Sequence, residues 1–369
     1  MDKKETIAVG ISGGVDSAVA AYLLKQQGYH VIGVTMQVWH GTGAEEHENV
    51  TAMKRDAEEV CRLLGIEHRL VTMESCFEDC VVKRFLNDYL RGRTPNPCVI
   101  CNHAVKWRAL REAADAVGAS LVGTGHYAAI RELDNGRKAV AVGKDRSKDQ
   151  TYMLYRLSQE QLNQTRMPLA DYTKEEIRDL ARSIGLPVAE KSDSQEICFI
   201  PDDDYAGFLE MQAERFAMQM PPAEGNFVGT DGTVLGKHKG IWHYTVGQRK
   251  GLDIALGHPV YVVAIRPESN EVVLGNADEV FCRELIAGEV FCQGIETVTE
   301  PISAVARIRY AHRGANCTVE PAGDGQIRIR FSEPQRAVTP GQAVVVYDGD
   351  TVLLGATIEY AEVSRTDTE

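Results

Sequence analysis

Short apolar runs alternate with amphipathic stretches between residues 5 and 204. This pattern predicts strands at residues 7–9, 31–36, 68–71 and 121–123, and helices at 17–27 and 50–64. Strands and helices in alternation indicate an α/β domain with a doubly wound parallel sheet, whose ligands bind where the strands end. That rule places the loop at Ser12, Met36 and Gly125 along one edge. Residues 41–49, rich in Gly, Glu and His, are predicted to form a loop.

The pattern changes near Pro221 and Pro222, which end a helical linker predicted for residues 201–223. Short β-branched runs separated by Gly, Asn or Asp follow at 261–265, 271–274, 305–310, 326–331, 343–347 and 352–358. Strands at this spacing without helices between them predict small β-rich domains. We therefore expect a first domain at 1–205, a linker with a small β domain at 206–275, and a C-terminal β-barrel at 276–369.

The composition is that of a globular protein, with 44% hydrophobic and 25% charged residues. No apolar run approaches the roughly 20 residues of a membrane helix, and the first residues lack a signal peptide, so we expect a cytoplasmic protein. Nine cysteines, an odd number, argue against a disulfide framework. We expect free thiols that serve chemistry or metal binding.

The net charge of −13 argues against a nucleic-acid partner, but the charge is unevenly distributed. Residues 81–111 contain seven Lys or Arg and one acid, and residues 237–250 contain four Lys or Arg and none. Residues 307–336 contain six Arg and three acids. These windows predict basic tracks that contact phosphates.

A glycine-rich string lies between the first predicted strand and the first predicted helix. It reads Gly10, Ile11, Ser12, Gly13, Gly14, Val15, Asp16, Ser17. Gly13 and Gly14 can take positive φ, so that backbone N–H groups converge on an anion beside a helix N-terminus. The string lacks the Gly-x-x-x-x-Gly-Lys-Ser/Thr spacing of nucleotide-hydrolase loops and the lysine within it. It therefore favours binding of a pyrophosphate over binding of a γ-phosphate. Asp16 is a candidate acid on the magnesium side.

Two cysteines, Cys98 and Cys101, follow a rigid approach through Pro95, Asn96 and Pro97. No second pair has matching spacing, so a zinc site is not predicted. The basic residues Arg93 and Lys106, with a helix start near Asn102, predict a lowered thiol pKa and a nucleophilic cysteine.

A third cysteine, Cys198, lies in a short apolar run where cysteine is usually a small core residue. The string at residues 12–17, however, resembles the pyrophosphatase loop of the ATP-pyrophosphatase superfamily, whose members adenylate an oxygen of their second substrate. That resemblance, together with two separated thiols, implies the groups needed to move sulfur onto an adenylated oxygen site. Cys198 could carry a persulfide, and Cys101 could release its terminal sulfur by disulfide exchange. This combination favours a functional role for Cys198.

Six strings together resemble the bacterial tRNA-specific 2-thiouridylases, members of the ATP-pyrophosphatase superfamily. They are residues 12–17, 95–97 with 101–102, 123–127, 148–152, 192–198 and 245–251. The resemblance implies a first domain like the adenine nucleotide alpha hydrolases. It also implies that ATP adenylates the C2 carbonyl of the tRNA wobble uridine, U34, with release of AMP and diphosphate. Sulfur from a cysteine persulfide then replaces the oxygen, which gives 2-thiouridine.

The resemblance implies the site residues and partners as well. ATP and Mg²⁺ would be held by Gly10 to Ser17, Met36 and Gly125, with Cys101 as nucleophile and Cys198 as persulfide carrier. Contacts to tRNA or its target base would come from Asn96, Pro97, Cys98, His126, Lys148, Asp149, Gln150, Arg309, Tyr310 and Gln342. The tRNAs would be those for Lys, Glu and Gln. An external cysteine desulfurase or sulfur-relay protein would supply the sulfur, since no pyridoxal-phosphate lysine signature is present.

The sequence departs from the family at Cys98, where some members have an Asp with a general acid/base role. A thiol with an ordinary pKa of about 8.5 is a poor substitute for a carboxylate. The target base must also leave the anticodon stack, and Tyr127, His126 or Trp107 could stack on it.

Two alternatives stay open at this point. One is an amide-forming ATP pyrophosphatase in which the cysteines are incidental. The other is a tRNA-binding iron–sulfur protein whose cluster is held by Cys98, Cys101 and Cys198.

Overall fold

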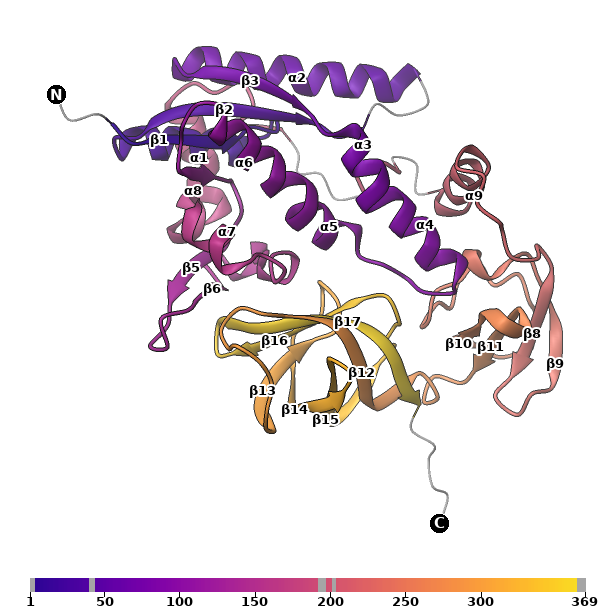
Figure 1. The fold of residues 1–369 in the computed structure, drawn as a ribbon. Coiled ribbons are helices and arrows are strands. Elements are labelled where there is room, and N and C mark those ends of the chain that lie inside the picture. Colours follow the sequence, from indigo (N-terminus) through magenta and orange to yellow (C-terminus); the bar gives the residue numbers. More distant parts are fainter. Residues whose placement is uncertain (1–3, 40–43, 192–196, 201–203, 364–369) are drawn as a thin grey trace. The chain divides into compact units, whose positions relative to one another are not determined.

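The computed structural model describes residues 4–39, 44–191, 197–200 and 204–363 (Figure 1). The chain forms two compact units, each assembled from separate stretches of sequence. The first unit consists of Met1–Val81, Cys98–Phe199 and Asp350–Val352. The second consists of Val82–Pro97, Ile200–Gly349 and Leu353–Glu369. The predicted domain borders near residues 205 and 275 stay a prediction.

The first unit is built on a five-stranded parallel sheet with the strand order β3-β2-β1-β4-β7. Its strands are β1 Thr6–Gly10, β2 His30–Gln37, β3 Glu67–Thr72, β4 Leu121–Gly123 and β7 Thr165–Arg166. Parallel neighbours bring their carboxyl ends to one edge, and Gly10 is paired with Val34 while Val9 is paired with Gly123. The predicted doubly wound parallel sheet is confirmed.

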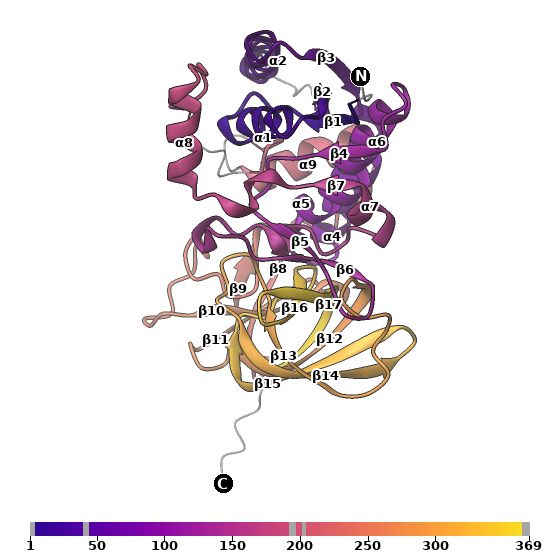
Figure 2. The same cartoon turned by 90° about the vertical axis from the view of Figure 1, so that its left-hand side faces the viewer.

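Helices cover both faces of this sheet. They are α1 Val15–Gln26, α2 Ala44–Leu64, α3 Glu74–Phe77, α5 Pro97–Ile100, α6 Trp107–Asp115, α7 Gln159–Gln164 and α8 Lys174–Ser183. Ile7 and Val9 of β1 are fully buried in a core that also contains side chains of α1, α2 and α8. Helix α6 packs on the other side of the sheet (Figure 2).

Several short elements complete the first unit. They are the hairpin β5 Ala129–Glu132 with β6 Lys138–Ala141, π-helical segments at Glu78–Val82 and Cys101–Lys106, and 3₁₀ turns at Arg146–Lys148, Thr151–Met153 and Pro168–Asp171. The loop prediction for residues 41–49 is wrong for 44–49, which begin α2. Alanine and glutamate favour helix, and acidic residues suit a helix N-terminus. Residues 41–43 lie outside the described residues.

The second unit contains α4 Lys83–Leu90, α9 Tyr205–Arg215 and a four-stranded sheet with the order β10-β11-β8-β9. The strands are β8 Gly225–Gly229, β9 Val234–His238, β10 Tyr261–Arg266 and β11 Glu271–Gly275, with 3₁₀ turns at Ile241–His243 and Pro267–Ser269. The predicted strands at 261–265 and 271–274 are confirmed. Strands β8 and β9 were not predicted because glycine interrupts their apolar runs.

The same unit contains a closed six-stranded barrel. Its strands are β12 Phe281–Cys292, β13 Ile302–Arg307, β14 Ala315–Gly323, β15 Gln326–Arg336, β16 Ala343–Asp348 and β17 Thr351–Val363. Strand β12 pairs with both β15 and β17, which closes the barrel. The predicted C-terminal barrel is confirmed, although the strand expected at 305–310 runs from 302 to 307 because Ile302 to Ala306 pair with β14. None of the described helices has the length and apolar content of a membrane span.

Candidate active site

The glycine-rich string forms the connection from β1 to α1. Gly13 has φ +71, and a Cβ there would lie 2.8 Å from the carbonyl oxygen of Met53. Gly14 instead has φ −105 and is the N-cap of α1, a position that requires extended backbone. Positive φ is therefore needed at Gly13 alone. Ile11 and Val15 are buried beneath the loop.

Hydrogen bonds inside the loop hold its shape. The Ser17 hydroxyl donates to the carbonyl oxygen of Gly14 over 3.0 Å and accepts from the Ser12 N–H over 3.1 Å. Among the described residues no side chain caps α1. Its first N–H groups are therefore available to an anion such as a phosphate.

The other predicted ATP residues lie beside this loop. A Cβ on Gly125 would come within 2.8 Å of the backbone carbon of Asp16 and the nitrogen of Ser17, so only glycine fits there. A Cβ on Gly10 would lie 3.6 Å from the Met36 Cε. The structure thus brings together residues from three strand ends, as the parallel sheet predicts.

Two lysines that sequence reasoning missed flank the loop. The Lys174 ammonium binds both carboxylate oxygens of Asp16 at 2.8 Å, and the Tyr127 hydroxyl donates to one of them over 2.7 Å. The Lys191 ammonium donates to the Gly13 carbonyl over 3.1 Å and pairs with Asp56 at 2.8 Å. Neither lysine belongs to a motif, and no local sequence signal could have placed them here.

The thiols of Cys98, Cys101 and Cys198 form a second group in the same unit. Cys98 and Cys198 are exposed, whereas Cys101 is 7% exposed. Cys98 and Cys198 lie near enough to Cys101 to contribute to raising its pKa. The charge of the Lys106 ammonium favours the thiolate form of all three cysteines. Residues 192–196, which precede Cys198 in its motif, lie outside the described residues.

The prediction of a lowered thiol pKa is wrong. Burial raises the pKa of Cys101 to about 12. The residues Cys98 and Cys198 are exposed, but surrounding protein desolvates their thiols enough to raise the pKa of each. In all three cases desolvation outweighs the charge of Lys106. The expected helix start near Asn102 lies instead at Pro97. Arg93, in the second unit, is paired with Asp88 and Glu359.

His126 is a neutral side chain packed on Trp107, with 5.6 Å between ring centroids. Burial and then the charge of Lys106 lower its pKa to about 3. Its Nδ1 is hydrogen-bonded to the Thr124 hydroxyl. Trp107 and Tyr127 are only 2% and 4% exposed, so their rings pack in the interior rather than offering a face to a base.

Residues 148–150 are predicted to contact tRNA, but the side chains of Asp149 and Gln150 form hydrogen bonds within the first unit. The Asp149 carboxylate accepts from the Thr151 N–H over 3.0 Å, and the Gln150 amide oxygen accepts from the Tyr127 N–H over 2.9 Å. Lys148 is half-buried at the end of a 3₁₀ turn. Asp149 and Gln150 thus shape the turn that presents Lys148.

In the second unit, Gln342 supports the approach to Asn96 and Pro97. Its side-chain amide donates to the carbonyl oxygen of Thr94 over 2.9 Å and lies 3.4 Å from that of Pro95. Asn96 is half-buried and Pro97 is buried. In the barrel, Tyr310 is 45% exposed, and Arg309 donates to the carbonyl of Arg336 over 3.0 Å.

The basic sequence windows are partly neutralised by acids from other strands and helices. Arg84 pairs with Glu289 at 2.5 Å, and Arg328 and Arg330 both pair with Glu284 at 2.7 Å. Counting charges along a window omits such partners, so the windows overstate the basic surface.

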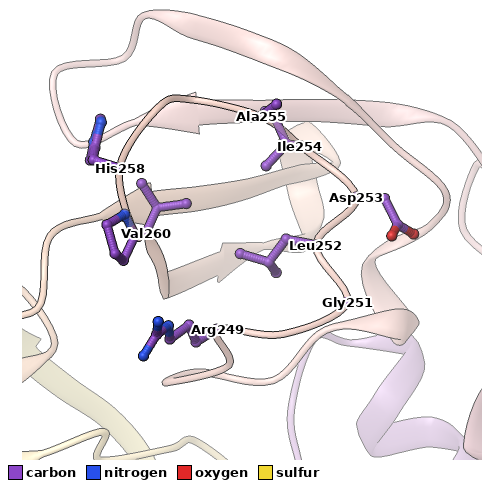
Figure 3. Close-up of a pocket in the computed structure, with 9 residues that line it drawn as sticks. Arg249, Gly251, Leu252, Asp253, Ile254, Ala255, His258 and Val260 are labelled. Atoms are coloured by element: carbon purple, nitrogen blue, oxygen red, sulfur yellow. The ribbon is translucent and has the colours of Figure 1, made fainter.

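A cavity of about 450 Å³ lies in the second unit, along the loop before β10 (Figure 3). Arg249, Asp253 and His258 are its charged or titratable lining residues, and it contains none of the predicted site residues. Over the described ranges, no group of three or more His, Cys, Asp or Glu is arranged to hold a metal ion.

Family models match three successive parts of the chain. They describe a tRNA methyl transferase HUP domain at residues 5–202, a tRNA methyl transferase PRC-barrel domain at 215–276 and an aminomethyltransferase beta-barrel domain at 283–358. The tRNA-specific 2-thiouridylase MnmA of Lachnoclostridium phytofermentans is 50% identical over 357 residues, 95% of this chain and 99% of that protein. The tRNA-specific 2-thiouridylase MnmA 1 of Caldanaerobacter subterraneus subsp. tengcongensis is 48% identical, with 97% and 99% covered.

Proposed function

This chain belongs to the tRNA-specific 2-thiouridylase family, and on that premise we propose that it thiolates C2 of the wobble uridine U34 of tRNA at the expense of ATP. The descriptions of two family models refer to methyl transfer, whereas the names of the relatives refer to thiolation. The group formed by Cys98, Cys101 and Cys198 around Lys106 favours sulfur chemistry. That group is the observation on which the proposal rests.

The first step is adenylation of the uridine C2 oxygen. The N–H groups at the start of α1 and the Gly13 turn bind the phosphates, with Lys191 beside them. ATP is cleaved between the α and β phosphates, which turns a poor leaving oxygen into AMP, a good leaving group. Lys174 fixes the position of the Asp16 carboxylate. With ATP bound, Asp16 would be the residue to hold Mg²⁺, which would supply positive charge to the phosphates.

The second step moves sulfur. Cys198 carries the persulfide, and the Cys101 thiolate attacks the Sγ of Cys198, so that the terminal sulfur leaves as hydrosulfide. Hydrosulfide adds to C2, AMP departs with the former C2 oxygen, and Cys101 and Cys198 end as a disulfide. Lys106 stabilises the thiolates against their desolvation. The raised pKa of Cys98 keeps that thiol protonated at neutral pH, so it does not act as a base in place of the aspartate that some family members have.

The remaining roles follow the family. Asn96, Pro97, His126, Lys148, Arg309 and Tyr310 contact the tRNA or its target base, and the tRNAs are those for Lys, Glu and Gln. A cysteine desulfurase or a sulfur-relay protein loads Cys198. The reaction takes place in the cytoplasm.

Mass spectrometry of nucleosides tests the proposal directly. Anticodon stem-loops incubated with ATP, Mg²⁺ and enzyme whose Cys198 has been loaded with a persulfide by a cysteine desulfurase should contain 2-thiouridine. Cys101→Ser and Cys198→Ser should each lower its formation by several orders of magnitude, because each removes a sulfur that forms and breaks bonds. Cys292→Ser, in the second unit, is the matched control and should retain full activity.

Two further measurements, of ATP turnover and of visible absorbance, separate the two alternatives. An amide-forming pyrophosphatase would keep its ATP turnover in Cys101→Ser. An iron–sulfur protein would absorb visible light after anaerobic purification, whereas the persulfide enzyme should be colourless. Absence of thiolated uridine with the wild-type protein would contradict the proposal.

A further inference from the structure

Two further cysteines, Cys76 and Cys80, form a close thiol pair in the first unit. Their Sγ atoms are 4.0 Å apart, and both side chains are half-buried. Cys76 lies in α3 and Cys80 in the π-helical segment that continues it. The pair has no part in the mechanism above.

The two thiols lie on one side of the segment, because residues four apart on a helix face the same way. Their Cβ atoms are about 5–6 Å apart at this spacing, whereas a disulfide holds them about 3.5–4.5 Å apart. Closing the disulfide therefore takes side-chain rotation together with a small backbone shift where the helix changes to its π-helical segment. The Arg108 guanidinium lies 3.9 Å from the Cys76 Sγ and favours its thiolate.

Cys76 is also adjacent to the segment that carries Cys101. Its thiol donates to the carbonyl oxygen of Ala104 over 3.6 Å, and Ala104 belongs to the π-helical segment Cys101–Lys106. The charge of Cys76 contributes to the pKa of Cys101, so the two thiols lie within electrostatic reach of each other.

Each turnover of the proposed function leaves Cys101 and Cys198 oxidised, and two electrons must return before the next one. We propose that Cys76 and Cys80 are the internal dithiol that reduces the Cys101–Cys198 disulfide. This inference rests on the proposed function, because that reaction creates the disulfide.

The exchange balances in two steps. The Cys76 thiolate attacks the Sγ of Cys101, and Cys198 leaves as a thiolate. The Cys80 thiolate then attacks the Sγ of Cys76, and Cys101 leaves. The product is a Cys76–Cys80 disulfide, which a small dithiol from solution reduces to complete the cycle.

Desolvation raises the pKa of Cys76, and the neighbouring Cys80 adds to that effect. The attacking thiolate is therefore scarce at neutral pH, so regeneration is slow there and becomes faster as the pH rises.

The test follows the disulfides through one turnover without added thiol. Enzyme loaded with persulfide is mixed with ATP, Mg²⁺ and anticodon stem-loop, quenched in acid, alkylated and mapped by mass spectrometry. The wild type should contain the Cys76–Cys80 disulfide. Cys80→Ser should trap a Cys76–Cys101 disulfide, and Cys76→Ser should retain Cys101–Cys198. All three should form one 2-thiouridine per enzyme, and Cys292→Ser should match the wild type.

Persistence of Cys101–Cys198 in the wild type, with Cys76 and Cys80 reduced, would overturn the relay and leave thiolation intact. Failure of the wild type to form any 2-thiouridine would overturn the proposed function instead. Because the wild type gives the decisive map, a variant that fails to fold does not remove the test.

Discussion

At the scale of single residues, the ammonium group of Lys106 affects the protonation of several neighbouring side chains. The charge of Lys106 favours the thiolates of Cys98, Cys101 and Cys198, although desolvation has the larger effect and raises the pKa of each. The same charge opposes protonation of His126. It lies five positions after Cys101 at the end of a π-helical segment, a geometry found often at functional sites. The sequence indicated that a cation is near these thiols, but the sign of the net pKa shift depends on burial.

We expect Lys106→Met to shift the alkylation of all three thiols to higher pH, because it removes the charge that lowers the pKa of each of them. In the wild type, alkylation of Cys101 should rise about tenfold per pH unit above neutrality without levelling off by pH 9, since its pKa is about 12. Iodoacetamide labelling across a pH series, read by mass spectrometry, measures both effects.

The control for this series is Lys144→Met, which removes an exposed ammonium paired with Glu176 at 2.6 Å. Its labelling profile should match the wild type. A plateau for Cys101 near pH 8 in the wild type would show that burial does not dominate.

At the scale of elements, the ATP loop is assembled from backbone rather than from side chains. Helix α1 starts uncapped, Gly13 turns the chain, and the segment after β4 approaches α1 closely at Gly125. The strand, the turn and the helix were predictable because they are consecutive in sequence. The contact from Gly125 follows only from the strand order, which places β4 beside β1.

Gly125→Ala should weaken ATP binding and destabilise the fold by about 1–3 kcal/mol. The added methyl would lie 2.8 Å from backbone atoms of Asp16 and Ser17, and backbone cannot move aside as a flexible side chain can. Urea unfolding and ATP titration measure the two effects.

Gly288→Ala is the control, because its Cβ would meet Glu359 at an ordinary 3.4 Å. It should leave both quantities near their wild-type values. An unchanged ATP affinity in Gly125→Ala would argue against close packing at this turn.

At the scale of the whole molecule, the chain is interleaved. Residues 82–97 belong to the second unit although they lie in sequence between two parts of the first. Barrel residues hold this segment, since Gln342 binds Thr94 and Glu359 pairs with Arg93. A division of the chain into three consecutive domains does not show that residues 82–97 belong to the second unit.

Gln342→Ala should lower kcat for thiolation while tRNA binding changes little, because the side chain positions residues 94–97 rather than binding RNA. Single-turnover rates and tRNA titrations separate the two quantities. Gln326→Ala, elsewhere in the barrel, should affect neither. A weakened tRNA affinity with unchanged kcat would instead support the direct tRNA contact that the family resemblance implies.

The sequence by itself determined the features that lie close together along the chain. Apolar periodicity gave the parallel sheet and the barrel, and the glycine string gave the loop between β1 and α1, because neighbouring residues impose these conformations on one another. Tertiary structure alone decided the rest. Lys174 reaches Asp16 across 158 positions and Lys191 reaches Gly13 across 178, and neither contact leaves a local signal. The direction of the thiol pKa shifts was also decided there, because it depends on how completely packing removes water from Cys101.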